Sequence, residues 1–182
     1  MSGPIERADS NMEILRRVDA HQQINTVLAR LSRGVDRLDR DLIVSCYHPD
    51  AIDDHGSFKG SASEFADWVI ARHRGNIDSC MHLLCNTLIE IDGDTARCES
   101  YVVAVYRFVK DGVRQDMFAP ARYLDLFERR NTEWKISNRL VVSEKDRLDP
   151  VLLEMKSPLT EMLTRGERTG DDVSYAFFSD AQ

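Results

Sequence analysis

The sequence predicts an α+β domain in which N-terminal helices cover the concave face of a curved, mainly antiparallel sheet. Apolar residues recur at helical spacing in the first part of the chain, and from Met81 onward the period changes to that of strands. Tight turns separate consecutive strand-like segments, which favours hairpins and therefore antiparallel pairing. A sheet that curves around helices leaves a cavity beside its concave face, and such a cavity is a natural site for a small molecule.

The helical part is expected to contain three helices. One apolar face with helical spacing predicts the first over residues 11–35, and its members are Ile24, Leu28, Leu31 and Val35. A short second helix is expected over residues 39–47, where the following His48-Pro49 pair ends it. Ser61 and Glu64 have the spacing of a capping box, which predicts the start of the third helix.

The rest of the chain is expected to form strands joined by tight turns. A short strand is predicted over residues 51–55, and four longer ones over residues 82–91, 96–109, 121–127 and 134–142. The apolar residues between 150 and 165 suggest a C-terminal helix, or a tail that packs on the sheet. We therefore divide the chain into a flexible N-terminus at 1–10, one domain at 11–147 and a C-terminal extension at 148–182.

Composition argues against several kinds of partner. The net charge of −7 disfavours nucleic acid, because an acidic surface repels phosphate groups. No run of lysine and arginine indicates a membrane surface, and no apolar stretch is long enough to span a bilayer. The first twelve residues are polar and lack the apolar core of a signal peptide, so we expect a cytoplasmic protein.

The four cysteines are expected to be reduced and mostly buried. Their spacing matches neither a zinc ribbon nor a C-x-x-C motif; they are Cys46, Cys80, Cys85 and Cys98. The sequence also lacks the glycine-rich nucleotide motifs and the paired-histidine motif of zinc proteases. We therefore predict a protein that works without a metal ion or other cofactor.

An acid–base pair is suggested by a carboxylate at the end of the first helix. Asp36 follows the apolar Val35, so its side chain can point toward the sheet. A buried carboxylate needs a partner, and a histidine on the facing sheet would supply one. In such a pair the carboxylate orients the imidazole while the other ring nitrogen takes a proton. Taken alone, a strand histidine and a helix-end aspartate are more often structural than catalytic.

Strand alternation assigns the polar residues to faces. His82 shares a face with Leu84 and Asn86, which suggests the lining of a cavity rather than a dry core. By the same rule Arg122 lies with Leu124 and Leu126. Arg139 is expected on one face with Lys135 and Ser137, opposite the face that carries Trp134 and Ile136. From spacing alone, Arg139 is more often a surface or ion-pair residue than part of a site.

Several short segments, in a characteristic order, resemble the SnoaL-like branch of the nuclear transport factor 2-like superfamily. They are Gly34-Val35-Asp36-Arg37, Tyr47-His48-Pro49-Asp50-Ala51, Phe58-Lys59-Gly60, Met81-His82 with Asn86, Ala121-Arg122-Tyr123, Phe127-Glu128-Arg129-Arg130 and Glu133-Trp134-Lys135-Ile136. The resemblance implies a cone-shaped α+β barrel. Within the superfamily the chain is most similar to the cofactor-free lyases, namely scytalone dehydratase, bile acid 7α-dehydratase and hexachlorocyclohexane dehydrochlorinase.

The resemblance implies roles for three residues. Those lyases share an aspartate at the end of the first helix and a histidine on the strand after the third, which correspond to Asp36 and His82 here. The dehydrochlorinase also uses an arginine that falls on Arg139. Where the bile acid enzyme has a tyrosine before its aspartate, this chain has Leu31, and residues 102–105 lack that enzyme's second acid.

We therefore predict a cofactor-independent lyase acting on a small apolar substrate, aromatic or polycyclic and hydroxylated. His82 is the expected base, Asp36 its partner, and Arg139 or Arg122 the group that steadies the developing anion. The expected substrate contacts are Leu31, Tyr47, Trp68, Asn86, Tyr101 and Arg122. The reaction could be a dehydration, another β-elimination or the loss of a small aldehyde. The alternatives are a non-catalytic binding or assembly module, and a cyclase or isomerase; in each case we expect a dimer or trimer.

Overall fold

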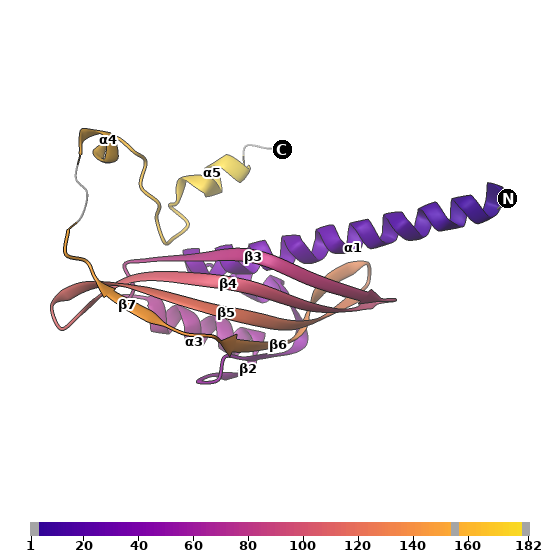
Figure 1. The fold of residues 1–182 in the computed structure, drawn as a ribbon, viewed down its shortest axis with the longest axis horizontal. Coiled ribbons are helices and arrows are strands. Elements are labelled where there is room, and N and C mark those ends of the chain that lie inside the picture. The colour runs from indigo at the N-terminus through magenta and orange to yellow at the C-terminus, as the bar shows by residue number, and fades with distance from the viewer. Residues whose placement is uncertain (1–3, 154–156, 180–182) are drawn as a thin grey trace.

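The structure is a computed structural model that describes residues 4–153 and 157–179. Three helices, α1 (Pro4–Arg37), α2 (Arg40–Ser45) and α3 (Ala62–His73), lie against one face of a curved seven-stranded sheet (Figure 1). This arrangement confirms the α+β prediction. The part of the chain that the structure describes contains no helix long and apolar enough to cross a membrane.

The sheet has seven strands, two more than the one short and four longer strands that the sequence predicted. Its strands are β1 (Tyr47–Asp54), β2 (Lys59–Ser61), β3 (Ser79–Asp92), β4 (Thr95–Lys110), β5 (Val113–Arg130), β6 (Glu133–Ser143) and β7 (Arg147–Pro150). They are ordered β2-β1-β6-β5-β4-β3, with β7 paired to β5. The β1–β6 pair is parallel and the other pairs are antiparallel. The first strand is therefore paired with a strand far along the chain, which local turn signals cannot predict.

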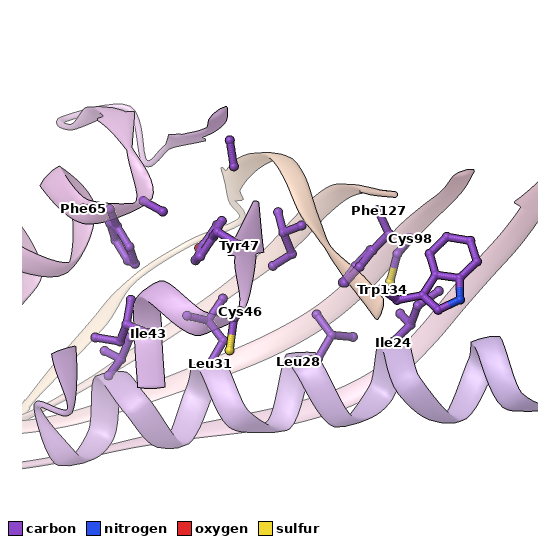
Figure 2. Close-up of a cluster of buried hydrophobic side chains, with 14 of the residues drawn as sticks. Ile24, Leu28, Leu31, Ile43, Cys46, Tyr47, Phe65, Cys98, Phe127 and Trp134 are labelled. Atoms are coloured by element: carbon purple, nitrogen blue, oxygen red, sulfur yellow. The ribbon is translucent and has the colours of Figure 1, made fainter. Parts of the chain in front are cut away.

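The core lies between α1 and the sheet. The predicted apolar stripe of α1 is buried, and Figure 2 shows Ile24 and Leu28 near Trp134 and Phe127 of the sheet. In the same view Leu31 lies beside Cys46 and Tyr47. Helix α1 begins at Pro4 instead of residue 11, and its N-terminal turns extend past the end of the sheet (Figure 1). That extension explains why its first apolar residues are exposed.

The predicted capping box starts α3 and supplies a stability test. Glu64 Oε2 accepts a hydrogen bond from the Ser61 backbone N–H at 2.8 Å, and Ser61 Oγ accepts one from the Glu64 N–H at 3.3 Å. We expect Ser61→Ala to lower the free energy of unfolding by about 1 kcal/mol, because one helical N–H loses its acceptor. Urea denaturation measures the loss. Ser61→Thr keeps the hydroxyl and should unfold close to the wild-type midpoint; equal losses in both variants would contradict the role of the cap.

An irregularity in β3 changes which residues face the helices. The pairing of β3 with β4 shifts between Leu84 and Thr87. Simple alternation placed Asn86 beside His82 on the inner face, but the shift leaves Asn86 exposed. The predicted role of Asn86 in the cavity is therefore wrong.

A second irregularity, in β6, has the opposite effect. Adjacent residues of β5 pair with Ile136 and Asn138, so Ser137 is an extra residue in β6. The extra residue places Arg139 on the same buried face as Trp134 and Ile136. The predicted face of Arg139 is therefore wrong, although its predicted position at the cavity is not.

The C-terminal extension differs from both forms that the sequence suggested. Instead of one helix over 150–165 there is a short α4 (Pro158–Glu161), because Pro158 can begin a helix but cannot continue one. Leu152 and Leu153 are exposed, so this part does not pack on the sheet; Met155 lies outside the described residues. The next segment, residues 166–175, and α5 (Val173–Ser179) lie near the C-terminal end of α1 (Figure 1).

Candidate active site

A cavity of about 210 Å³ lies between the helices and the concave face of the sheet. Helices α1 and α3 supply Leu31 and Trp68 to its wall, as the sequence predicted. The polar part of the wall contains three histidines, two tyrosines, two arginines and two serines: His55, His73, His82, Tyr106, Tyr123, Arg72, Arg139, Ser32 and Ser57. The cavity wall therefore combines apolar side chains with many proton donors and acceptors.

Asp36 and His82 form the pair that the sequence suggested. His82 Nδ1 lies 2.7 Å from Asp36 Oδ1, and the His82 backbone N–H donates to Asp36 Oδ2 at 3.1 Å. The backbone contact is available because β3 is the last strand of the sheet, so its outer edge has no further strand to bond. The predicted contact is confirmed, while the part that the pair plays in catalysis stays a prediction.

The geometry fixes how this pair can act. Asp36 holds the proton on Nδ1 of His82, since a carboxylate can only accept a hydrogen bond. The other ring nitrogen, Nε2, is then the basic one, and the ring forms part of the cavity wall. Both side chains are largely buried, which limits competition from water. The arrangement can therefore take a proton from a molecule in the cavity and hold the resulting imidazolium.

Cys80 lies beside the pair and was not predicted to. Its Sγ is 3.7 Å from His82 Nδ1, and together with Asp36 these side chains could supply three ligand atoms to one metal ion. Burial, followed by the Asp36 charge, raises the pKa of the Cys80 thiol well above its usual range. A metal ion would need the thiolate and would displace the hydrogen bond to Asp36. The hydrogen-bonded pair fits these residues better, and the cofactor-free expectation stays a prediction.

A second histidine–carboxylate pair faces the same cavity and was missed. His55 Nδ1 makes a short contact with Asp53 Oδ1, and Asp53 is fully buried. Tyr47 donates its hydroxyl proton to the other oxygen of Asp53 at 2.6 Å. The His55 ring stacks on Phe65 with 4.6 Å between ring centroids. The alternating Asp-x-His pattern of Asp53 and His55 was the available signal, since residues two apart share a strand face.

Arg139 is at the cavity but is already paired. Its Nε and Nη2 each donate to an oxygen of Asp125 at 2.7 Å, and its guanidinium lies 4.0 Å from the centre of the Tyr123 ring. Both members of the ion pair are buried. The charge that would steady an anion is therefore largely balanced by Asp125, so Arg139 is less available to a substrate than the sequence suggested.

Three further predicted contacts do not line the cavity. Tyr47 is buried beneath it and bound to Asp53. Tyr101 and Arg122 are paired neighbours on the outer face of β4 and β5, where Arg122 donates to Glu144 at 2.6 Å. Their assignment to the substrate site is wrong, because the strand residues that face inward here are the ones adjacent to them, such as Tyr123.

His73, at the end of α3, was not singled out by any motif. It is buried, and its ring packs edge-on against Tyr106 with 5.5 Å between centroids. Burial, with the nearby Arg168 charge as the next cause, lowers the pKa of His73 to about 4. His73 is therefore neutral at physiological pH.

This lowered pKa predicts a loss of stability in acid. An unfolded histidine titrates near 6.5, so below that pH the unfolded chain binds a proton that the folded chain takes only near pH 4. Stability should fall as the pH drops through this window, by about 3 kcal/mol in total. Urea unfolding at several pH values measures the slope. His73→Gln should make it shallower, and an unchanged slope would contradict the assignment.

Solved structures with this architecture define the class of fold. The chain is similar to the hexachlorocyclohexane dehydrochlorinase LinA-type3 of Novosphingobium barchaimii, with a TM-score of 0.67 and 21% identity over 79% of this chain and 98% of that one. A scytalone dehydratase-like protein of Novosphingobium aromaticivorans gives a TM-score of 0.61 with 15% identity, over 77% of this chain and 90% of that one. The chain therefore shares its fold with these two proteins.

The sequence itself identifies the family. Residues 16–140 match the model of the SnoaL-like domain, so the chain belongs to the SnoaL-like family. A relative in Mycobacterium tuberculosis, the protein Rv2910c, is 28% identical over 136 residues, which are 72% of this chain and 90% of that protein. The match to the SnoaL-like domain covers Asp36, His82 and Arg139 but ends before the C-terminal extension.

Proposed function

We propose that the protein is a cofactor-independent lyase in which His82 is the base and Asp36 its partner. The observation that carries the proposal is the Asp36–His82 hydrogen bond at the wall of a partly apolar cavity, with the basic Nε2 left for a substrate. The family and the similarity in fold to a dehydrochlorinase and a dehydratase-like protein support a lyase.

The proposed reaction is a β-elimination. His82 Nε2 takes a proton from carbon, the C–H electron pair forms the new double bond, and the leaving group departs with the electron pair of its own bond. Asp36 stabilises the imidazolium of His82 that forms, because its negative charge lies next to the new positive charge. An isomerase would share the first proton transfer to His82. A lyase then releases the leaving group, whereas an isomerase releases none.

Cavity size narrows the substrate class. A volume of about 210 Å³ lies below the range of roughly 300–1,000 Å³ that drug-sized ligands occupy. We therefore favour a substrate with one ring over the polycyclic compounds that the sequence left open. Trp68, Phe65 and Leu31 supply apolar wall for such a ring.

One observation favours a second candidate, a non-catalytic module. Asp36 bonds the backbone of His82 as well as its ring, which is also how a purely structural carboxylate would hold β3 against α1. In that case neither residue would affect turnover of any compound, and both would affect stability.

A substrate panel tests the proposal. We expect the purified protein to eliminate water or another small group from single-ring compounds with both hydroxyls on an aliphatic side chain or from single-ring β-hydroxy ketones. It should leave hydroxysteroids unchanged because they exceed the cavity. Mass spectrometry detects the loss. Nitrobenzisoxazole, whose ring opens when a base removes one C–H proton, reports on the base independently of the natural substrate. Failure to accelerate this ring opening or to convert any panel compound would contradict the proposal.

A further inference from the structure

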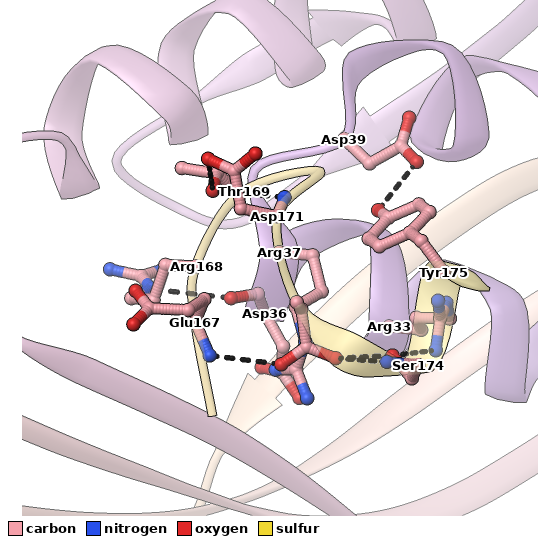
Figure 3. Close-up of polar contacts among 11 residues, drawn as sticks. Arg33, Asp36, Arg37, Asp39, Glu167, Arg168, Thr169, Asp171, Ser174 and Tyr175 are labelled. Carbon is pink, nitrogen blue, oxygen red and sulfur yellow. Dashed lines mark hydrogen bonds and ion pairs between the residues drawn. The ribbon is translucent and has the colours of Figure 1, made fainter. Parts of the chain in front are cut away.

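The C-terminal extension places Arg168 in contact with Asp36 and His73, next to the candidate active site. Residues 166–175 pass over the end of α1, where Tyr175 donates to Asp39 at 2.7 Å and Asp172 forms an ion pair with Arg37 at 3.3 Å (Figure 3). Within the segment, Asp172 accepts the Glu167 N–H at 2.9 Å. Figure 3 shows Arg168 directed from this segment toward Asp36. The segment lies outside the SnoaL-like match, which ends at residue 140.

Arg168 bonds three backbone carbonyls around the site. Its guanidinium donates to the oxygens of Asp36 at 3.2 Å, Ile77 at 3.0 Å and Val35 at 3.5 Å. Val35 and Asp36 lie in the last turn of α1, where a cation is favourable. The Val35 carbonyl also accepts the Leu38 N–H at 3.3 Å. Arg168 therefore fixes the backbone that carries Asp36.

The fourth contact of Arg168 determines the tautomer of His73. Arg168 Nη2 lies 3.1 Å from His73 Nδ1. A guanidinium has only donors, so Nδ1 must accept and must carry no proton. The single proton of the neutral ring is then on Nε2. The assignment of the His73 tautomer follows from the donor chemistry of Arg168 alone and does not depend on the protonation of neighbouring side chains.

The surroundings of His73 keep it neutral. It faces cations and a second histidine on several elements, against one carboxylate; these groups are Arg168 from the extension, Arg72 on α3, His82 on β3 and Asp36 on α1. The phenol of Tyr106 on β4 packs against its ring, and burial raises the pKa of that phenol well above its usual range. A neutral imidazole beside these groups remains a donor through Nε2–H.

His73 lines the cavity, and its Nδ1 is taken by Arg168. His73 belongs both to the cavity wall and to the wall of a separate groove that Arg168 also lines. Arg168 lines the groove and contacts Nδ1, so we infer that the opposite edge of the ring, which carries Nε2, is the edge toward the cavity. The same cavity wall carries His82, the proposed base.

We infer that Arg168 is a positioning residue that holds His73 as the Nε2–H tautomer, and that His73 donates this hydrogen bond to a carbonyl oxygen of the ligand. The inference rests on the proposed function and names its substrate class, a carbonyl compound with a leaving group at the β carbon. His82 takes the proton from the carbon beside the carbonyl, and the C–H pair moves to form an enolate. His73 stabilises the enolate oxygen without giving up its proton, and the enolate pair then expels the leaving group.

Nitrogen NMR on histidine-labelled protein tests the tautomer directly. In the wild-type protein we expect His73 to show a protonated Nε2 and an unprotonated Nδ1 at neutral pH. Arg168→Met should give a mixture of tautomers and a higher titration midpoint, whereas Arg165→Met, an exposed arginine of the same extension, should not. A protonated Nδ1 in the wild-type protein would overturn the inference, and this readout does not require the variant to fold.

A matched pair of ligands tests the hydrogen bond. Acetophenone and α-methylstyrene have nearly the same shape, but only the first has a carbonyl oxygen. We expect His73→Phe to weaken acetophenone binding about five- to tenfold and to leave α-methylstyrene binding unchanged. His73→Gln keeps a donor and should restore most of the difference. Equal effects on both ligands, or no binding of acetophenone at all, would overturn the carbonyl assignment.

The two proposals fail in different ways. If His82→Ala leaves nitrobenzisoxazole opening unchanged, the proposed base is wrong, whatever the tautomer of His73. If His82→Ala abolishes it while His73 carries its proton on Nδ1, the lyase proposal stands and the inference about Arg168 is overturned.

Discussion

Replacing His82 with alanine should lower turnover by about 10²–10⁴-fold, because the substitution removes the base and little packing. Initial rates of nitrobenzisoxazole opening and of panel substrates measure the loss, and circular dichroism checks that the domain remains folded. His48→Ala is the matched control, since His48 is also a buried strand histidine but bonds the Glu128 carbonyl at 2.9 Å. It should leave the rate of catalysis close to wild type.

Asp36→Asn should reproduce most of that loss. The amide keeps the size of the carboxylate but lacks the charge that stabilises the imidazolium, so the rate should fall more than substrate binding does. The double variant of Asp36 and His82 should be little worse than His82→Ala alone, because the two residues act as one unit. Full additivity, or a His82→Ala protein with near wild-type turnover, would favour the structural module.

The largest effect on stability is expected at Asp125. Asp125→Ala leaves the Arg139 guanidinium buried without its partner, which typically costs about 3–5 kcal/mol. Urea denaturation measures the free energy of unfolding. Asp50→Ala breaks an exposed ion pair with Arg130 and should leave the midpoint nearly unchanged.

A second variant separates the ion pair from the packing around it. Replacing Asp125 with leucine and Arg139 with methionine together removes both charges and fills a similar volume. This double variant should recover much of the stability lost in Asp125→Ala. If the double variant is as unstable as the single one, the loss comes from packing and not from the unpaired charge.

Periodicity predicted the parts of this fold that depend on local patterns. The α1 stripe, the capping box at Ser61 and the hairpins of β3 to β6 follow from residues close together in the sequence. The parallel pairing of β1 with β6 was not predictable in this way, since it joins segments separated by the whole of α3 and four strands.

The site residue at the end of a helix, Asp36, was predicted correctly. The strand residues whose facing depends on the register of β3 and β6 were not. The contact of Asp36 with His82 was expected from the position of each in its element and from the family resemblance. Asn86 and Arg139 were assigned to the wrong faces, because one extra residue in a strand inverts every later side chain. No local pattern marks His73, whose setting depends on an arginine 95 residues later.

The contact between Arg168 and Asp36 also sets an order of events during synthesis. The two residues are 132 positions apart, and Arg168 follows the last long strand, which ends at Ser143. Because domains begin to fold as the chain emerges, the sheet and the Asp36–His82 pair can form while Arg168 is still unmade. Until the ribosome has added the residues between Ser143 and Arg168, the nascent chain would contain the Asp36–His82 pair but not the arginine that determines the tautomer of His73. The contact between Arg168 and His73 is therefore expected to form last, after the sheet and the cavity beside it.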